Sequence, residues 1–191
     1  MDRRSFVGSM VMGGGAFAMS AVGPRKGSDM NSDLPRNVQM QFLRPGQLEA
    51  RGRTFPVVYV PFGLIEWHGV HLPLGNDAMK AHGILVKCAE KFGGVVYPPV
   101  YFHAGFDQEH IVPVVSQLFQ RLKKTGYRVI IGVSGHNVQK QIEMIDEALE
   151  PVVADGTVAG MGMWEMTLSR GPDSNSDHAA KWETSTLRVF S

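Results

Sequence analysis

The sequence predicts an α/β protein, a three-layer α/β/α sandwich with a mostly parallel central sheet. Short runs rich in β-branched residues alternate with longer segments of helical periodicity, which is typical of strands joined by crossover helices. Titratable residues follow the first and third of these runs. Ligands of such sheets bind beyond the carboxyl ends of the strands, so this placement fits the same class.

Four segments are predicted as strands, because they are short, apolar and bounded by turn-forming residues. They are residues 54–60 (TFPVVYV), 95–102 (VVYPPVYF), 127–133 (YRVIIGV) and 158–168 (VAGMGMWEMTL).

The segments between and after them carry helical patterns, at residues 78–92, 114–125, 138–152 and 178–190, the last a helix or turn. Asn76 and Asp77 resemble an N-cap for the first helix. Pro113 is expected to open the second, and Gly126 to end it.

Composition restricts the function classes. The chain has 191 residues, of which 43% are hydrophobic and 19% charged, as in a globular domain. A formal net charge of +1 offers no basic field for a phosphate backbone, so nucleic-acid binding is not expected. The single cysteine, Cys88, excludes an internal disulfide.

Residues 1–21 are expected to be an export signal of the twin-arginine type, which sends the protein to the periplasm or another extracytoplasmic space. Arg3 and Arg4 precede an uncharged, small-residue run. A retained membrane anchor and a basic start without function are the alternatives, but three glycines (13–15) interrupt the run. No stable membrane insertion is expected after cleavage.

Residues 22–53 are then a polar linker leading to the first strand, and residues 54–191 form the α/β domain.

Four residues predict a metal centre. Glu66 and His68, two apart, follow the first strand, His136 follows the third, and Asp77 begins a helix. Converging carboxylates and imidazoles suit Zn²⁺, Mn²⁺ or Fe²⁺. Taken singly, Asp77 could be a helix cap and His136 a loop histidine, while His71 is expected to stabilise the loop.

The stretch PFGLIEWHGVHLPLGND (residues 61–77) resembles the signature of the creatininase family of metal-dependent amidohydrolases, Pro-x-Gly-x-x-Glu-x-His-Gly-x-His-Leu-Pro-Leu-Gly-x-Asp. VSGHN resembles the family's Asn-Gly-His segment, with Ser134 in place of Asn. HAAKWETS resembles a His-Ala-Gly-x-x-Glu-Thr-Ser block, with Ala180 in place of Gly. Together the matches extend from about residue 55 to residue 187.

The resemblance implies one or two divalent ions and hydrolysis of a C–N amide bond in a cyclic amide, formamide or small peptide-like substrate. It implies a homo-oligomer, a hexamer in many relatives. Glu66, His68, Asp77 and His136 would be metal ligands, with Asp77 bridging. His178 would carry a proton from the attacking water to the leaving nitrogen, and Glu183 would complete or orient the ligand shell.

Two departures from the family pattern leave a second reading open. Val138 stands where creatininase carries a ligating Glu, and a Phe-Pro-Gly-Thr stretch expected after His110 is missing. Creatinine is therefore not the expected substrate, and a non-catalytic metal- or ligand-binding relative is the alternative. If Glu183 or Asp177 supplies the missing ligand, two ions can still bind. A dinucleotide-binding domain is disfavoured, because no glycine-rich loop follows the first strand.

Overall fold

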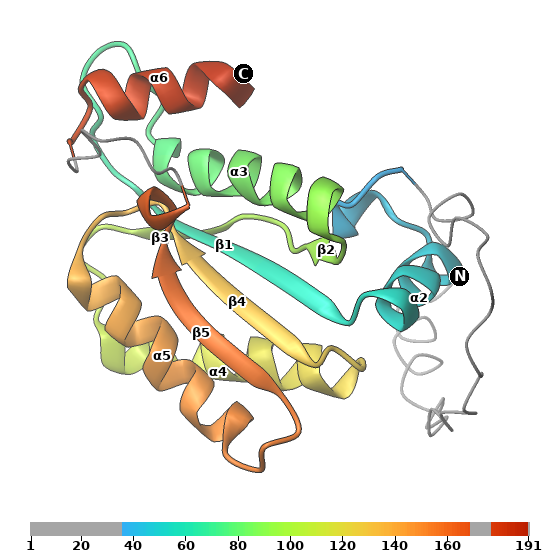
Figure 1. The fold of residues 1–191 in the computed structure, drawn as a ribbon. Coiled ribbons are helices and arrows are strands. Elements are labelled where there is room, and N and C mark those ends of the chain that lie inside the picture. Colours follow the sequence, from blue (N-terminus) through green and yellow to red (C-terminus); the bar gives the residue numbers. More distant parts are fainter. Residues whose placement is uncertain (1–35, 169–176, 191) are drawn as a thin grey trace, which may run out of the picture. The chain divides into compact units, whose positions relative to one another are not determined.

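The computed structural model describes residues 36–168 and 177–190, so the expected export signal lies outside the described residues. Figure 1 shows the elements in space. In chain order they are η1 (Met40–Phe42), α2 (Pro45–Thr54), β1 (Val57–Ile65), α3 (Asn76–Phe92), β2 (Val95–Val96), β3 (Val100–His103), α4 (Gln108–Lys124), β4 (Val129–Ser134), α5 (Gln139–Val153), β5 (Ala159–Trp164), η2 (Glu165–Thr167) and α6 (Lys181–Phe190).

The strands form one parallel sheet in the order β2–β1–β4–β5, with β3 also paired to β1, which confirms the predicted fold class. β2 and β3 lie on the same edge of β1. The single strand predicted over residues 95–102 is thus divided, with Pro98 and Pro99 at the break, because proline has no N–H to donate to a ladder.

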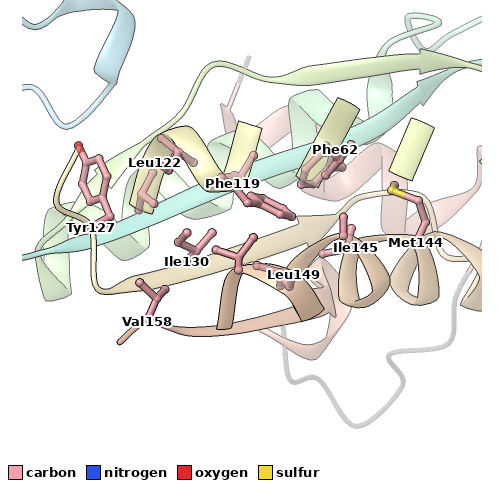
Figure 2. Packing of buried hydrophobic residues seen from close by; sticks show 14 of the residues in the cluster. Phe62, Phe119, Leu122, Tyr127, Ile130, Met144, Ile145, Leu149 and Val158 are labelled. Atoms are coloured by element: carbon pink, nitrogen blue, oxygen red, sulfur yellow. The ribbon is translucent and has the colours of Figure 1, made fainter. Parts of the chain in front are cut away.

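Helices cover both faces of the sheet (Figure 1). Val58, Val60 and Phe62 of β1 belong to the core that α4 and α5 close. Figure 2 shows Phe62, Phe119, Ile130 and Ile145 in this core. Tyr59 instead joins the cluster beneath α3. Burial of alternate β1 residues on opposite sides explains why the strand reads as a continuous apolar run.

Two helix starts differ from the prediction. α3 begins at Asn76 with Gly75 as its N-cap, and no side chain caps it, so the cap interpretation of Asp77 is wrong. α4 begins at Gln108, which places Pro113 inside the helix. Proline removes only one backbone hydrogen bond there, while Val115 and Phe119 bury the face that anchors the helix.

Two elements were not predicted within the stretch expected to be a linker. η1 and α2 form there, and Arg51 of α2 donates from Nε to the carbonyl oxygen of Gly94 at 3.2 Å. None of the helices in residues 36–168 and 177–190 is long and apolar enough to cross a membrane.

The first turn of α3 lies directly against the sheet because two glycines leave room for it. A Cβ atom on Gly63 of β1 would collide with the Cβ of Asp77 and the backbone nitrogen of Ala78. A Cβ on Gly135, just after β4, would collide with the carbonyl oxygen of Asp77. Asp77 is therefore held between the ends of two strands by backbone contact.

Gly63→Ala is expected to destabilise the protein by about 1–3 kcal/mol, because the added methyl forces α3 away from β1. Urea unfolding measures the loss. Gly52→Ala is the matched control, since nothing lies within 4 Å of that Cβ and the site is inside α2. The control should gain about 0.5–1 kcal/mol from helix propensity. Equal stability of the two variants would contradict the close-packing account.

Candidate metal centre

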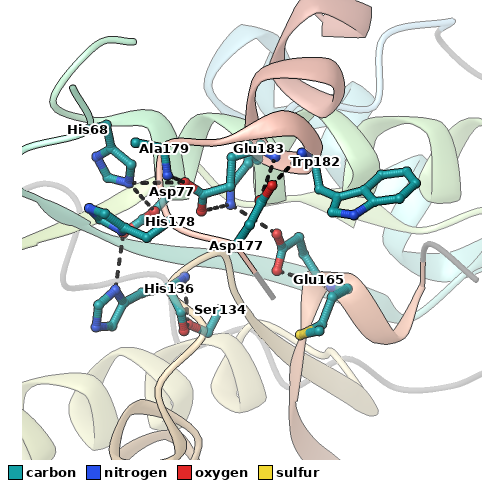
Figure 3. Close-up of polar contacts among 12 residues, drawn as sticks. His68, Asp77, Ser134, His136, Glu165, Asp177, His178, Ala179, Trp182 and Glu183 are labelled. Carbon is teal, nitrogen blue, oxygen red and sulfur yellow. Dashed lines mark hydrogen bonds and ion pairs between the residues drawn. The ribbon is translucent and has the colours of Figure 1, made fainter. Parts of the chain in front are cut away.

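The carboxyl ends of β1 and β4 bring the four predicted ligands together. Figure 3 shows three of them, His68, Asp77 and His136. Glu66 and His68 follow β1 directly, and His136 comes two residues after β4 ends. Asp77 reaches them from the first turn of α3. Side chains up to 70 residues apart in sequence thus meet at one edge of the sheet, as the strand-end rule predicts.

Asp77 is the centre of this group. It is almost fully buried, with Oδ1 2.9 Å from His68 Nε2 and Oδ2 3.5 Å from His136 Nδ1. Oδ2 also accepts the backbone N–H of Leu64 at 3.2 Å. Burial works to raise the pKa of Asp77, but His136, Lys80, His68 and this N–H outweigh it and lower the pKa. Asp77 therefore remains a carboxylate with its two oxygens directed to different partners.

Glu66, Asp77 and His136 form one possible ligand group. Glu66 Oε1 lies 3.0 Å from His136 Nδ1, 3.9 Å from His68 Nε2 and 4.0 Å from His178 Nδ1. Although buried among three imidazole nitrogens, this oxygen accepts no hydrogen bond within the described part of the chain. A buried carboxylate oxygen that faces three imidazole nitrogens, one of them 3.0 Å away, fits a cation site.

Ser134, which stands where the family carries Asn, holds the backbone of His136. Its hydroxyl oxygen accepts the His136 N–H at 3.1 Å and lies 2.7 Å from the His136 carbonyl oxygen. The substitution therefore keeps the loop after β4 in a fixed conformation.

His68, Asp77 and Glu183 form a second possible group, which shares Asp77 with the first. His68 Nδ1 lies 3.1 Å from the Glu66 carbonyl oxygen, which can only accept, so the proton belongs on Nδ1. His68 Nε2 then faces Asp77 Oδ1 at 2.9 Å and Glu183 Oε2 at 3.7 Å. An imidazole nitrogen grouped with two carboxylate oxygens is a donor arrangement that suits a divalent ion.

His178 lies on the solvent side of the centre. Its side chain is more than half exposed, and its ring centroid is 4.7 Å from that of His68. Nε2 donates to the Trp67 carbonyl oxygen at 2.8 Å, so Nδ1 is the acceptor nitrogen of the neutral ring, and it lies 4.0 Å from Glu66 Oε1. His178 can thus accept a proton at the mouth of the site.

Several residues near the motifs lie outside these groups. Asp177 accepts the N–H groups of Trp182 and Glu183 at 2.7 and 3.1 Å, so it caps the start of α6. Val138 is the N-cap residue of α5. His71 Nε2 lies 3.2 Å from Thr184 Oγ1 and links its loop to α6, in line with the loop role expected for it.

Sequence reasoning missed Lys80 and Glu165. Lys80 is fully buried, with Nζ 2.5 Å from Glu183 Oε1 and 3.1 Å from Glu165 Oε1. Burial works to lower the pKa of Lys80, but the two carboxylates raise it above its ordinary value. Burial raises the pKa of Glu165 despite Lys80. The available signal was the position of Lys80 three residues after Asp77, on the same face of α3.

Comparison with known proteins identifies the family of the chain. The family model described as creatinine amidohydrolase matches residues 42–190. The chain belongs to the creatininase family. Among solved structures, a creatinine amidohydrolase (creatininase) is 20% identical with a TM-score of 0.65, over 79% of this chain and 71% of that one. "Creatininase Mn" gives 0.64, at 20% identity, over 78% and 71%. At such identity, these structures support the fold alone.

Two curated relatives are mycofactocin precursor peptide peptidases. The one from Mycobacterium ulcerans is 27% identical over 155 residues, covering 70% of this chain and 58% of the relative. The one from Mycolicibacterium smegmatis is 30% identical over 149 residues, covering 69% of this chain and 57% of the relative. This chain spans less than three-fifths of the length of either relative.

The metal-free protein is expected to lose stability as the pH rises through the pKa of His136. Burial works to lower that pKa, but Asp77 and Glu66 raise it above its ordinary value. The contribution of charged His136 is therefore complete below about pH 6.5 and is lost as the pH rises through the raised value. Urea unfolding in chelator from about pH 5.5 to about pH 9 measures this slope.

His136→Gln should flatten the slope, whereas His110→Gln, at an exposed position on α4, should leave it unchanged. An identical slope in wild type and His136→Gln would contradict the assignment. The lowered pKa of Asp77 affects stability in a different pH range. The contribution of Asp77 to stability is lost only as the pH falls below about 4.

Proposed function

We propose that this protein is a metal-dependent hydrolase that cleaves a C–N amide bond in a small amide or peptide-like substrate. The observation that carries the proposal is the pair of ligand groups sharing Asp77, with His178 Nδ1 4.0 Å from Glu66 Oε1. Membership of a family of amidohydrolases supports the same reaction class.

The donor set fits one or two divalent ions. Glu66, Asp77 and His136 would hold one, and His68, Asp77 and Glu183 the other. Position 138 carries no ligating side chain. In the second group the carboxylate of Glu183, from α6, would take the place of that missing ligand. Mixed nitrogen and oxygen donors suit Zn²⁺, Mn²⁺ or Fe²⁺. When bound, such ions act as Lewis acids that make water a nucleophile near neutral pH and polarise a carbonyl.

The chain's own contribution to the reaction is proton transfer by His178. Its unprotonated Nδ1 would accept a proton from the attacking water, and would then donate it to the leaving amide nitrogen. The Trp67 carbonyl keeps the ring orientation fixed by accepting from Nε2. Because the side chain is 57% exposed, a substrate amide can reach it from solvent.

The size of the substrate is suggested by the relatives. Both curated relatives are named as peptidases acting on a precursor peptide. The open position of His178 at the edge of the sheet is compatible with a peptide-like chain. We infer a peptide or formamide-like substrate in preference to creatinine, in keeping with Val138 in place of a ligating Glu.

A non-catalytic creatininase-like binding protein is the second candidate. Val138, at the position where a ligating Glu is expected, is 45% exposed and carries no donor atom. In that case metal or ligand would bind at the same groups without turnover.

We also propose export of the protein by a twin-arginine signal in residues 1–21, on the sequence pattern alone.

Asp77→Asn is expected to abolish metal retention and activity, because the carboxylate belongs to both ligand groups. Elemental mass spectrometry of protein reconstituted with Mn²⁺ or Zn²⁺ gives the metal content per chain. One or two equivalents are expected for wild type, and less than a tenth of that for the variant, in line with the loss of a charged ligand from both groups. Asp155→Asn, at an exposed carboxylate paired with Lys123, is the control. Undiminished metal in Asp77→Asn would remove Asp77 from the ligand set.

His178→Ala is expected to lower turnover by about 10²–10⁴-fold while metal content stays unchanged, because only proton transfer is lost. Hydrolysis is assayed on a panel of cyclic amides, formamides and short peptides. His110→Ala, at an exposed position on α4, should keep full activity. Loss of metal in His178→Ala would make it a ligand, and a wild type that binds metal but hydrolyses nothing would favour the non-catalytic candidate.

A further inference from the structure

A buried ion cluster adjoins the candidate metal centre and is not used by the reaction proposed above. Lys80 Nζ lies between Glu183 Oε1, at 2.5 Å, and Glu165 Oε1, at 3.1 Å. All three side chains are at least nine-tenths buried, and they come from α3, η2 and α6. Figure 3 shows Glu165 and Glu183 near His68, His136 and His178.

The two carboxylate oxygens of Glu183 have different partners. Oε1 is taken by Lys80, whereas Oε2 accepts the Ala179 N–H at 2.7 Å and lies 3.7 Å from His68 Nε2. Glu183 thus presents one oxygen to the second ligand group. Its orientation is fixed from both sides without any ion, which is how a preorganised ligand is held.

The negative charges of the buried carboxylates also need positive charge nearby. Asp77, Glu165 and Glu183 are all buried, and buried carboxylates so close together repel one another strongly. Lys80 is a permanent ammonium one helical turn after Asp77, and its charge acts on Asp77 as well. A divalent ion held by His68, Asp77 and Glu183 would also offset the charge of Glu183.

We propose that Lys80 is a positioning residue that holds Glu183 in place and offsets its charge, so that the second ligand group is assembled before metal enters. This inference rests on the proposed metal centre. Lys80 and the ion act on the same carboxylate, so their stabilising effects overlap. Loss of Lys80 therefore harms the metal-free protein more than the loaded one.

The test is thermal unfolding of the full chain, in chelator and in excess Mn²⁺, for wild type and Lys80→Met. Methionine keeps the length of the lysine stem and removes the charge. In chelator the midpoint should fall by roughly 10 °C, as expected when one partner of a buried ion pair is removed from a chain of this size. In Mn²⁺ the fall should be less than half as large.

Lys87→Met is the matched control, because Lys87 is on the same helix but exposed, paired with Glu90. Its midpoint should change by no more than about 2 °C in either condition. A fall in Lys80→Met that is equal in chelator and Mn²⁺ would overturn the proposal and leave Lys80 as a structural residue.

A double variant, Lys80→Met with Glu183→Gln, separates this inference from the metal proposal. Measured in chelator only, it should recover at least half of the midpoint lost by Lys80→Met, because the uncompensated carboxylate is gone. If Lys80→Met alone does not fold, recovery of folded protein in the double variant supports the charge role, and no recovery overturns it. If wild type binds no metal, the metal centre fails, while this chelator comparison still decides the role of Lys80.

Discussion

The close contact between the first turn of α3 and the ends of β1 and β4 is the constraint on which the candidate site depends. Gly63 and Gly135 carry no Cβ, so the backbone at Asp77 can lie against both strands. From that position the Asp77 carboxylate contacts His68 and His136 with different oxygens. Ligands delivered by two strands thus become one centre, because a helix start is held between them.

Charge is the second organising factor. Four carboxylates, from Glu66, Asp77, Glu165 and Glu183, gather in and beside the centre, and three of them are almost fully buried. Such a set is stable only when positive charge is placed among it. Lys80 provides part of that charge from within the fold, and the imidazoles point nitrogen atoms at the remaining oxygens. The same electrostatic demand therefore favours both the buried lysine and a bound cation.

Sequence patterning was sufficient to predict the layer order, and to predict that Glu66, His68, Asp77 and His136 lie together at one edge of the sheet, because strand ends and a long motif both indicate these residues. It placed the start of α4 wrongly, since Pro113 is tolerated where apolar burial outweighs one missing hydrogen bond. It also described Asp77 as a plausible cap, because local preferences do not register a partner such as the N–H of Leu64. Lys80 was missed: its position three residues after Asp77 was a signal, but the partner that accounts for its burial, Glu183, is 103 residues away.

The position of α6 has a consequence for how the protein is made. The sheet and the side chains of Glu66, His68, Asp77 and His136 all precede Thr167, whereas His178 and Glu183 come later in the chain. A polypeptide interrupted on the ribosome after η2 would hold all the strands found in residues 36–168 but lack His178, the candidate proton carrier, and Glu183, the fifth candidate ligand. Synthesis of α6, and not acquisition of the sheet, therefore marks the moment at which the whole candidate centre can first form.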